Sequence, residues 1–448
     1  MTSIAPWPAK FPTRADAPAF AVARRGGLVW LFALSCFLPY PAIAIGNRTG
    51  LQISHVLTAL AIPALLLRPP GRTLWALLLI LAPVYLSGFV NAMRPATVEV
   101  DVLPKEVLAT TLAVCVLWPS SWLAERRRFR LALAAAAAAT VLHAVVGLIQ
   151  VEAFTRDEFP MLFLYRNPSF KNMENWAASY ARYMKRPCGL FPEPSAMAAG
   201  LGPWLVVLAG ISAAPGDARG LGLTRRDRQL YGAASAAGLL LLALSRSGAA
   251  LAIMAGILIA CLGQARGLLR SVKPGTWLGA GLLLVGALAA AAYVTSTVGS
   301  RLDQRVEASW GLRGLSIVTG MTANTEPLDL AFGVGPGQST AVVRRLLSWF
   351  PLPEGQDDMA VWSLSVAYYM ENGLIGGAAI VAVLLTAARS VARSSALALG
   401  VGALLAWVVG VGVTTSYLHL SSVWLFLGAL LNWDKIFPVG ARVEGAPP

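Results

Sequence analysis

Long apolar runs, separated by short polar stretches, recur along the 448 residues of the chain. Most runs are about 17–25 residues long, the length with which an α-helix crosses a hydrocarbon core of about 30 Å. We therefore predict an all-α, polytopic membrane protein with about twelve transmembrane helices. The predicted helices cover residues 27–46, 51–68, 73–92, 103–123, 131–152, 194–213, 230–245, 247–263, 276–296, 361–387, 396–415 and 420–433.

Composition supports this class. Hydrophobic residues make up 56% of the chain, charged residues only 13%, and the mean hydropathy is +0.64. Soluble domains usually carry about 25% charged residues.

The net charge of +14 raises the question of nucleic-acid binding, and its distribution answers it. With a cytoplasmic N-terminus, the predicted cytoplasmic segments hold 21 of the 36 Lys and Arg residues but only 6 of the 22 Asp and Glu residues. Basic clusters such as 125–130 and 224–228 fall on this side. This is the pattern of the positive-inside rule, so the charge reports topology and we expect no nucleic-acid partner.

The resulting division of the chain has seven segments. They are a cytoplasmic tail (1–26), transmembrane helices one to five (27–152), a periplasmic loop (153–193), helices six to nine (194–296), a large periplasmic loop (297–360), helices ten to twelve (361–433) and a cytoplasmic tail (434–448).

The two periplasmic loops are the only long ones, which predicts chemistry or binding on the outer face. The stretch 172–186 alternates aromatic and charged residues and predicts a helix along the membrane interface. Three cysteines lie in apolar runs, and Cys188 is alone on the outer face. Without a CxxC motif or a His/Cys cluster, we expect no metal and no cofactor.

The stretch "YMKRPCGLFPEPSAMAAGLGPWLVVLAG" (183–210) places charges at the outer mouth of a predicted helix. Pro194 suits a first helical turn, and the N–H groups of a helix N-terminus bind anions. Lys185 and Arg186 add positive charge there, although anchoring to lipid headgroups also explains them. Glu193 lies between two prolines at the membrane edge, and is either a general base or acceptor-positioning group, or the partner of a nearby arginine.

A second anomaly is Arg246. One helix over 230–263 would be about 50 Å long at 1.5 Å per residue, too long for a single crossing. We therefore predict a tight outer turn at Ser245–Gly248. Arg246 in this turn could hold phosphate oxygens with its planar fork or extend to lipid headgroups.

The second loop and the following helix hold the remaining candidates. Arg301, Arg305 and Arg313 precede "LAFGVGPGQST" (330–340), whose glycines permit tight turns or close approach to a ligand. Glu371 lies inside predicted helix ten, where a carboxylate is either functional or paired with an arginine.

Taken in order, "RPCGLFPEPS", "SRSG", "GVGPG" and "ENGLIG" resemble motifs of the bacterial O-antigen ligase and Wzy-type polysaccharide polymerase superfamily. These multi-pass enzymes of the GT-C class join sugars carried on undecaprenyl pyrophosphate. The resemblance covers about 186–377. It implies that Arg186 and Arg246 bind the lipid pyrophosphate, that Arg313 is an auxiliary arginine of the loop, and that Glu371 is the acidic residue of the late helix. Lys185, from its charge beside Arg186, is a further candidate for pyrophosphate binding.

The chain departs from the ligase pattern at one position. Ligases carry a histidine about nine residues before the late glutamate, where this chain has Trp362 and Ser363. Together with "FPEPSA", which resembles the polymerase branch, this favours a polymerase. His419, at the outer end between the last two predicted helices, is a weaker candidate. So are Tyr180 and Arg182.

The resemblance thus predicts a metal-independent, inverting polymerase that transfers glycan from undecaprenyl pyrophosphate to a lipid-linked repeat unit, with Glu193 or Glu371 as the base. The expected partners are lipid-linked oligosaccharides, membrane lipids, and a chain-length regulator and export machinery. The alternatives are an O-antigen ligase that uses lipid A-core as acceptor, and a lipid-linked sugar flippase or other transporter.

Overall fold

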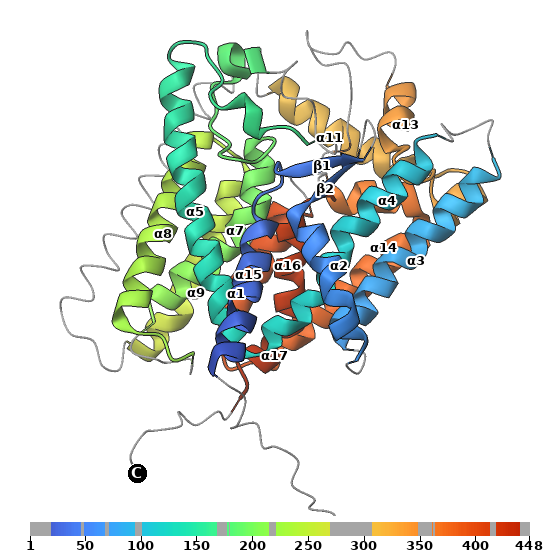
Figure 1. Ribbon diagram of the computed structural model, residues 1–448. Helices are drawn as coiled ribbons and strands as arrows, with labels where there is room; N and C mark the ends of the chain where they lie inside the picture. The colour runs from blue at the N-terminus through green and yellow to red at the C-terminus, as the bar shows by residue number, and fades with distance from the viewer. Residues whose placement is uncertain are drawn as a thin grey trace, which may run out of the picture.

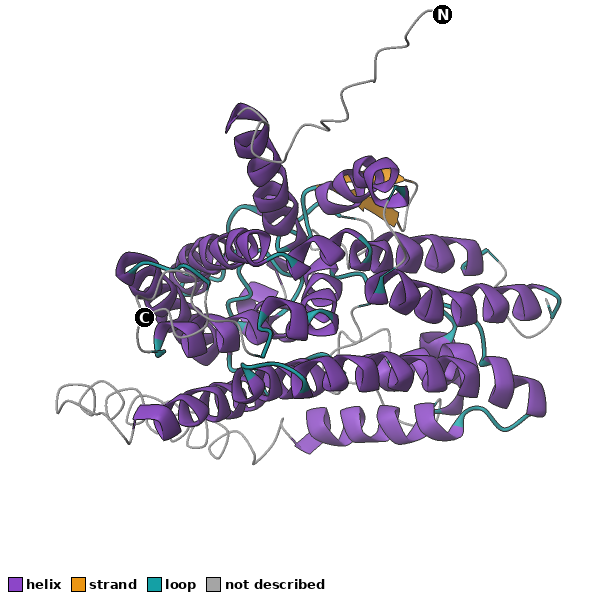
Figure 2. Cartoon of the chain, turned by 90° about the horizontal axis from the view of Figure 1, so that it is seen from below, coloured by secondary structure: helices purple, strands orange, loops and turns teal. Residues whose placement is uncertain are grey.

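The computed structural model describes residues 19–45, 49–67, 71–94, 101–167, 177–178, 180–214, 221–268, 307–347, 361, 363–412 and 418–439. In these residues the fold is almost entirely helical (Figure 2). The elements are α1 (Ala19–Cys36), β1 (Ala42–Ile45), β2 (Thr49–Gln52), α2 (Ile53–Leu66), α3 (Arg72–Ala92), α4 (Leu103–Val114), α5 (Arg126–Phe154), α7 (Pro194–Ser212), α8 (Arg225–Ser245), α9 (Ala249–Leu268), α11 (Glu307–Thr322), α12 (Pro327–Phe332), α13 (Ser339–Leu346), α14 (Leu364–Ala392), α15 (Leu397–Gly410), α16 (Ser421–Leu431) and α17 (Trp433–Ile436).

Five of the described helical segments are long and apolar enough to cross a membrane: α3, α4 with the 3-10 turns that follow it to Ala124, α5, α7 and α14. Shorter apolar helices lie within the predicted helices 27–46, 51–68, 247–263, 396–415 and 420–433. The predicted helix 230–245 falls in α8, which is helical but is not among these apolar helices. The predicted helix 276–296 lies outside the described residues. A helical protein with several helices of membrane-spanning length is therefore confirmed, and the number twelve stays a prediction.

The first two predicted helices need correction. The run 27–46 does not form one helix, because α1 ends at Cys36 and residues 42–45 form a strand. Strand β1 pairs antiparallel with β2, with Ile43 opposite Leu51. Pro39 and Pro41 explain the break, since proline lacks the N–H that continues a helix. The following helix therefore starts at Ile53 rather than at 51. The short two-stranded sheet is an addition to a fold that remains consistent with the predicted all-α class.

The centre of the fold is made by α7 and α16. Every residue of α16, and nearly every residue of α7, is buried. Two buried tryptophans, Trp204 and Trp424, stand in this core, and the ring of Trp204 packs edge-on against Phe426 at 5.0 Å. Helices α5, α8, α9 and α15 surround α7.

Small residues allow the closest helix contacts, as expected for apolar helices that pack without much hydrophobic driving force. Helices α9 and α15 meet at Gly256 and Gly402, where an added Cβ on Gly256 would lie 2.5 Å from the carbonyl oxygen of Gly402. The alanine-rich start of α5 also packs closely, and its residues Ala132, Ala135, Ala136 and Ala139 are fully buried.

Most of the long helices run between two ends of the molecule (Figure 1). We call the end with the β1–β2 sheet, α11 and α13 the hairpin end. The opposite end, with α17 and the first residues of α3 and α5, is the basic end. Predicted cytoplasmic segments meet at the basic end, where Arg126 donates to the carbonyl of Ile436 and Ser395 donates to that of Phe437.

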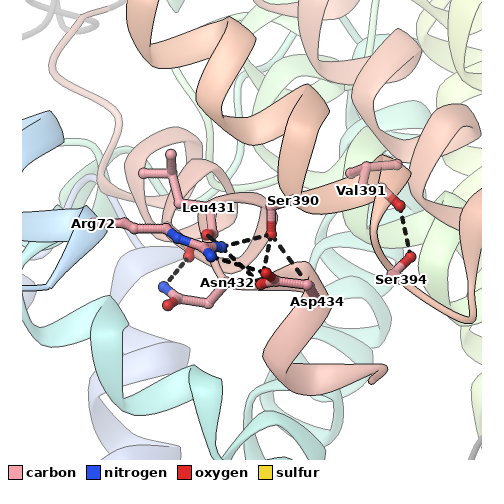
Figure 3. Close-up of polar contacts among 8 residues, drawn as sticks. Arg72, Ser390, Val391, Ser394, Leu431, Asn432 and Asp434 are labelled. Carbon is pink, nitrogen blue, oxygen red and sulfur yellow. Dashed lines mark hydrogen bonds and ion pairs between the residues drawn. The ribbon is translucent and has the colours of Figure 1, made fainter. Parts of the chain in front are cut away.

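At the basic end, an ion pair and its hydrogen bonds join α3, α14 and α17 (Figure 3). The guanidinium of Arg72 donates to both carboxylate oxygens of Asp434, at 2.8 and 2.9 Å. The hydroxyl of Ser390 also donates to Asp434, at 2.9 Å. Partial burial raises the pKa of the Asp434 carboxyl, but the hydrogen bonds from Arg72 and Ser390 outweigh it, so this pKa lies below its usual value of 3.8.

We expect the stabilisation from this pair to depend on pH. Because the folded pKa of Asp434 is depressed, the contribution is present above the unfolded value near 3.8 and is lost as the pH falls through the folded pKa. Thermal unfolding of wild type and Asp434→Asn, measured in detergent across this range, should show a less stable variant at pH 7. The two melting temperatures should converge at acidic pH. A difference that persists at pH 2 would contradict this explanation.

Candidate functional site

The first part of the site is the N-terminus of α7. Glu193 is the N-cap residue in extended conformation, and Pro194 is the first helical residue, as predicted. The hydroxyl of Ser195 donates to a carboxylate oxygen of Glu193. Within the described part of the chain Glu193 forms no ion pair, so the pairing with an arginine considered for it is not seen there. Its side chain is half-buried.

The segment before Glu193 is held by one side chain of α5. The carboxamide oxygen of Gln150 accepts from the backbone N–H groups of Cys188 and Gly189, at 2.9 and 3.0 Å. Its nitrogen donates to the carbonyl of Gly189 at 3.0 Å and to the hydroxyl of Tyr165. Tyr165 donates to the same carbonyl. Gln150 therefore satisfies a stretch of backbone that has no secondary structure of its own.

His143 of α5 holds the next residue. Its Nδ1 accepts from the backbone N–H of Leu190 at 2.9 Å, and its Nε2 lies 2.9 Å from the carbonyl oxygen of Phe37. These two partners require a neutral ring protonated on Nε2. Gly189 has a φ of +58°, and a Cβ there would lie 2.7 Å from Nδ1 of His143. The glycine of "RPCGLF" is thus needed for both its conformation and its close approach.

Tyr180 lies between the candidate cation and the candidate carboxylate. It is buried, and its hydroxyl donates to the carbonyl oxygen of Arg186 at 2.8 Å. Burial raises the pKa of Tyr180 well above its usual value, Cys188 and Glu193 raise it further, and Arg186 opposes them. Burial likewise raises the pKa of the Cys188 thiol to about 12. Both groups are neutral at physiological pH.

Arg186 contacts the turn between α8 and α9. Its Nε donates to the carbonyl of Ser245 at 2.7 Å and an Nη donates to the carbonyl of Arg246 at 2.8 Å. The predicted turn at 245–248 is confirmed, because α8 ends at Ser245 and α9 begins at Ala249. The structure thus brings Arg186 and Arg246 together from positions 60 residues apart.

Arg246 is the exposed member of this pair. Its backbone is left-handed, with a φ of +52°, and closes α8 by donating to the carbonyl of Ala243 at 3.1 Å. Its side chain is exposed and forms no ion pair among the described residues. The first turn of α9 follows directly, so a cation and a helix N-terminus stand side by side, which favours anions.

Lys185 and Arg182 stand apart from this arrangement. The ammonium of Lys185 lies 2.7 Å from a carboxylate oxygen of Asp157, in an exposed ion pair. Arg182 is exposed and lies near the same carboxylate. The predicted interface helix 172–186 is described only in part, as a π-turn over Tyr180–Met184.

The second part of the site is Glu371, on α14 near the hairpin end. Its carboxylate accepts from the hydroxyl of Ser339 at 2.5 Å and from the backbone N–H groups of Gly337 and Ser339. Its carbonyl accepts from Ser87 at 2.6 Å and from Gly335 at 3.2 Å. Among the described residues, the partners of Glu371 are therefore the glycine loop and the start of α13, and no arginine there pairs with it.

Glycines make this contact possible. Gly333, Gly337 and Gly373 all have φ values between +63° and +76°. A Cβ on Gly333 would lie 2.3 Å from the backbone of Glu371, and one on Gly337 would lie 2.2 Å from Cγ of Glu106. The "GVGPG" segment, which alone is a weak signal, thus docks on the part of α14 that carries the "ENG" motif.

Sequence reasoning missed Glu106. This residue lies in the first turn of α4, and one of its carboxylate oxygens is 3.3 Å from Nε2 of His419. It is also near enough to Glu371 to affect it electrostatically. The signal was the same as at Glu193: a carboxylate just after a proline, at the outer edge of an apolar run.

The other candidates have limited structural description. Arg313 lies in α11, but its side chain is outside the described part of the chain, as are Arg301, Arg305 and Trp362. Ser363 caps α14, because its hydroxyl accepts from the N–H of Val366 and donates to the carbonyl of Gly412. Among the residues that the structure describes, no group of three or more His, Cys, Asp or Glu side chains is placed to hold a metal ion.

Replacing Gly189 by alanine should destabilise the site. A left-handed conformation costs a non-glycine residue about 1–2 kcal/mol, and the new Cβ would also push against His143. The matched control is Gly314→Ala in α11, where a Cβ meets open space, so this change should be neutral or slightly stabilising. Melting temperatures in detergent measure both variants. Equal melting temperatures would show that His143 does not constrain Gly189.

Comparisons with known proteins do not assign the chain to a family. No protein-family model and no curated protein matches the chain. The likeness to polysaccharide ligases and polymerases is carried by the four short motifs alone, and any activity taken from it is a proposal.

Proposed function

We propose that the chain is a membrane-embedded glycosyltransferase of the polysaccharide polymerase type, acting at the hairpin end on glycans linked to undecaprenyl pyrophosphate. The observation that carries the proposal is the meeting of Arg186 with Arg246 at the α8–α9 turn. Two separate motifs of the resembled superfamily, both assigned there to the pyrophosphate, thus contact each other beside a helix N-terminus, through the guanidinium of Arg186 and the backbone of the turn that carries Arg246.

The two arginines have different parts in this proposal. Arg186 is a positioning residue, because two of its nitrogens bind the carbonyls of Ser245 and Arg246. Arg246 is exposed and binds the pyrophosphate, and the N–H groups at the start of α9 add to the positive potential. Negative charge that develops on the leaving pyrophosphate is then stabilised by groups already in place.

The reaction is a single displacement at the anomeric carbon. The acceptor hydroxyl oxygen forms a bond to this carbon while the bond to the pyrophosphate oxygen breaks, and the pyrophosphate leaves with the electron pair. Glu193 takes the proton of the acceptor hydroxyl. The configuration at the anomeric carbon is inverted, since no covalent glycosyl-enzyme intermediate forms.

Glu193 suits the role of base better than Glu371. Glu193 is half-buried. Among the described side chains, the hydroxyl of Ser195 donates a hydrogen bond to its carboxylate. Glu371 is buried and bound by Ser339 and two backbone N–H groups. A carboxylate with this many donors holds a loop in place, and deprotonating a substrate would cost it those contacts.

One observation favours the ligase alternative. Nε2 of His419 lies 3.3 Å from a carboxylate oxygen of Glu106, and Glu106 is near enough to Glu371 to affect it electrostatically. A histidine therefore stands in the neighbourhood of the late-helix glutamate, although it comes from another part of the chain than the ligase histidine.

The substrate test separates polymerase from ligase. Purified protein given only lipid-linked repeat units should produce a ladder of lengthening lipid-linked glycans on a gel. A ligase should do nothing until lipid A-core is added, because repeat units alone provide it with no acceptor. Transfer that appears only with lipid A-core would make the chain a ligase, and no transfer in either mixture would contradict both readings.

The arginine variants should differ in what they lose. Arg246→Ala should lower the polymerisation rate by about 10²–10³-fold, as for a lost transition-state donor, with little change in melting temperature. Arg186→Ala should lower both the rate and the melting temperature, because the turn loses its donors. Lysine should rescue either site poorly if the fork is required. Arg156→Ala, which removes an exposed arginine of the same loop, is the control. Normal ladders from Arg246→Ala would overturn the pyrophosphate role.

Glu193→Gln should lower the rate more than Glu371→Gln. Glutamine keeps the shape of Glu193 but takes no proton, so we expect a loss of about 10²–10⁴-fold. Glu371→Gln should instead lower the melting temperature, because Ser339 and the loop N–H groups lose an anionic acceptor. Glu152→Gln on the exposed end of α5 is the control. A Glu193→Gln variant with most of the wild-type rate would show that this carboxylate is not the base.

A further inference from the structure

A cavity of about 200 Å³ lies at the basic end, far along α14 from Glu371. One water needs roughly 10–15 Å³ of such space, so the cavity has room for a larger polar group. Its lining comes from the start of α3 and the last turns of α14: Arg72, Thr386, Arg389, Ser390 and Arg393. Nothing in the proposed glycosyl transfer uses it.

The cavity has an excess of positive charge. Arg72 is paired, because its guanidinium binds both oxygens of Asp434 (Figure 3). Arg389 and Arg393 are exposed and have no acidic partner among the described residues. They are four residues apart on one helix face, where like charges repel each other. The lining thus holds three guanidinium groups, of which only that of Arg72 is paired with a carboxylate, and the surplus favours a bound anion.

Two simpler causes account for basic residues at this place but not for the cavity. Cations are favoured at a helix C-terminus, and the positive-inside rule places arginines at cytoplasmic ends. Neither requires arginines from two helices around a common space lined also by Ser390 and Thr386. Hydroxyl donors and planar guanidinium groups together are the groups that bind phosphate oxygens.

The apolar neighbours of the cavity indicate where the anion comes from. Trp75, one turn from Arg72 on α3, is 59% exposed, and Leu385, one turn before Arg389 on α14, is 53% exposed. Exposed apolar side chains next to a polar cavity at a helix end are typical of contact with lipid, and tryptophan is enriched at membrane interfaces. A headgroup that binds here would place its acyl chains along these residues.

We propose that this cavity binds the phosphate of an anionic phospholipid. Arg389 and Arg393 are the main contacts of the phosphate, and Arg72, which Asp434 holds in place, lines the cavity beside them. Basic pockets between transmembrane helices recognise anionic headgroups in this way. The bound lipid would neutralise the repulsion between the two arginines and join α3 to α14 at the end opposite the candidate site.

The test is native mass spectrometry of the full chain in detergent, titrated with phosphatidylglycerol or with phosphatidylcholine. Phosphatidylglycerol should bind more tightly than phosphatidylcholine. The double variant Arg389→Gln and Arg393→Gln should weaken phosphatidylglycerol binding by about tenfold or more, as expected when charge-assisted hydrogen bonds to a phosphate are removed. Millimolar inorganic phosphate should not compete.

The matched control is the double variant Arg127→Gln and Arg226→Gln. It removes the same charge from exposed arginines on α5 and α8, outside the cavity, and should leave binding unchanged. Equal weakening in both double variants would reduce the effect to general surface charge and overturn the proposal. Competition by inorganic phosphate would identify a soluble anion instead of a lipid. Should the glutamine variant fail to elute as a folded protein, the corresponding double lysine variant is used, and full phosphatidylglycerol affinity in it would exclude a bidentate arginine site.

Discussion

Backbone that lies among apolar helices must find hydrogen-bond partners within the protein, and here α5 supplies them to the segment that carries the candidate site. Gln150 and His143 together bind the backbone of residues 188–190. That segment in turn sets where Glu193 begins α7 and where Arg186 reaches the α8–α9 turn. The candidate site therefore depends on two neutral side chains that carry no chemistry of their own.

The same need for hydrogen-bond partners within the protein explains the second part of the site, around Glu371. A buried carboxylate is costly unless donors surround it, and Glu371 obtains them from Ser339 and the backbone of the glycine loop. Gly333 and Gly373 let the loop and the kinked helix approach to contact distance. A polar residue inside an apolar helix can thus mark a docking point for a loop as well as a catalytic group.

Periodicity and length predicted the helices well, because the distance across a membrane and the geometry of an α-helix leave little freedom. The turn at Arg246 followed from the same arithmetic. The β1–β2 sheet was missed since a run of apolar residues looks alike in a helix and a buried strand, and only the prolines near Tyr40 signalled a change.

The hydrogen-bond partners of the site residues were harder to predict than the positions of these residues in the helices. The sequence placed Arg186 near a helix mouth, but which carbonyls it binds depends on a turn 60 residues later. Glu106 needed the fold to bring it to His419.

The short connection between α8 and α9 has a consequence for how the protein is made. Only Arg246, Ser247 and Gly248 separate the two helices, so neither can enter the bilayer as an independent unit. In the topology that the charges predict, α8 and α9 insert together as a pair of antiparallel helices, and Arg246 crosses the membrane in the turn between them. Arg186 comes earlier in the chain, so in the same topology it crosses before the turn does, and its guanidinium then donates to the carbonyls of Ser245 and Arg246. In that topology, the hydrogen bonds between Arg186 and the turn can form only after the turn has crossed the membrane.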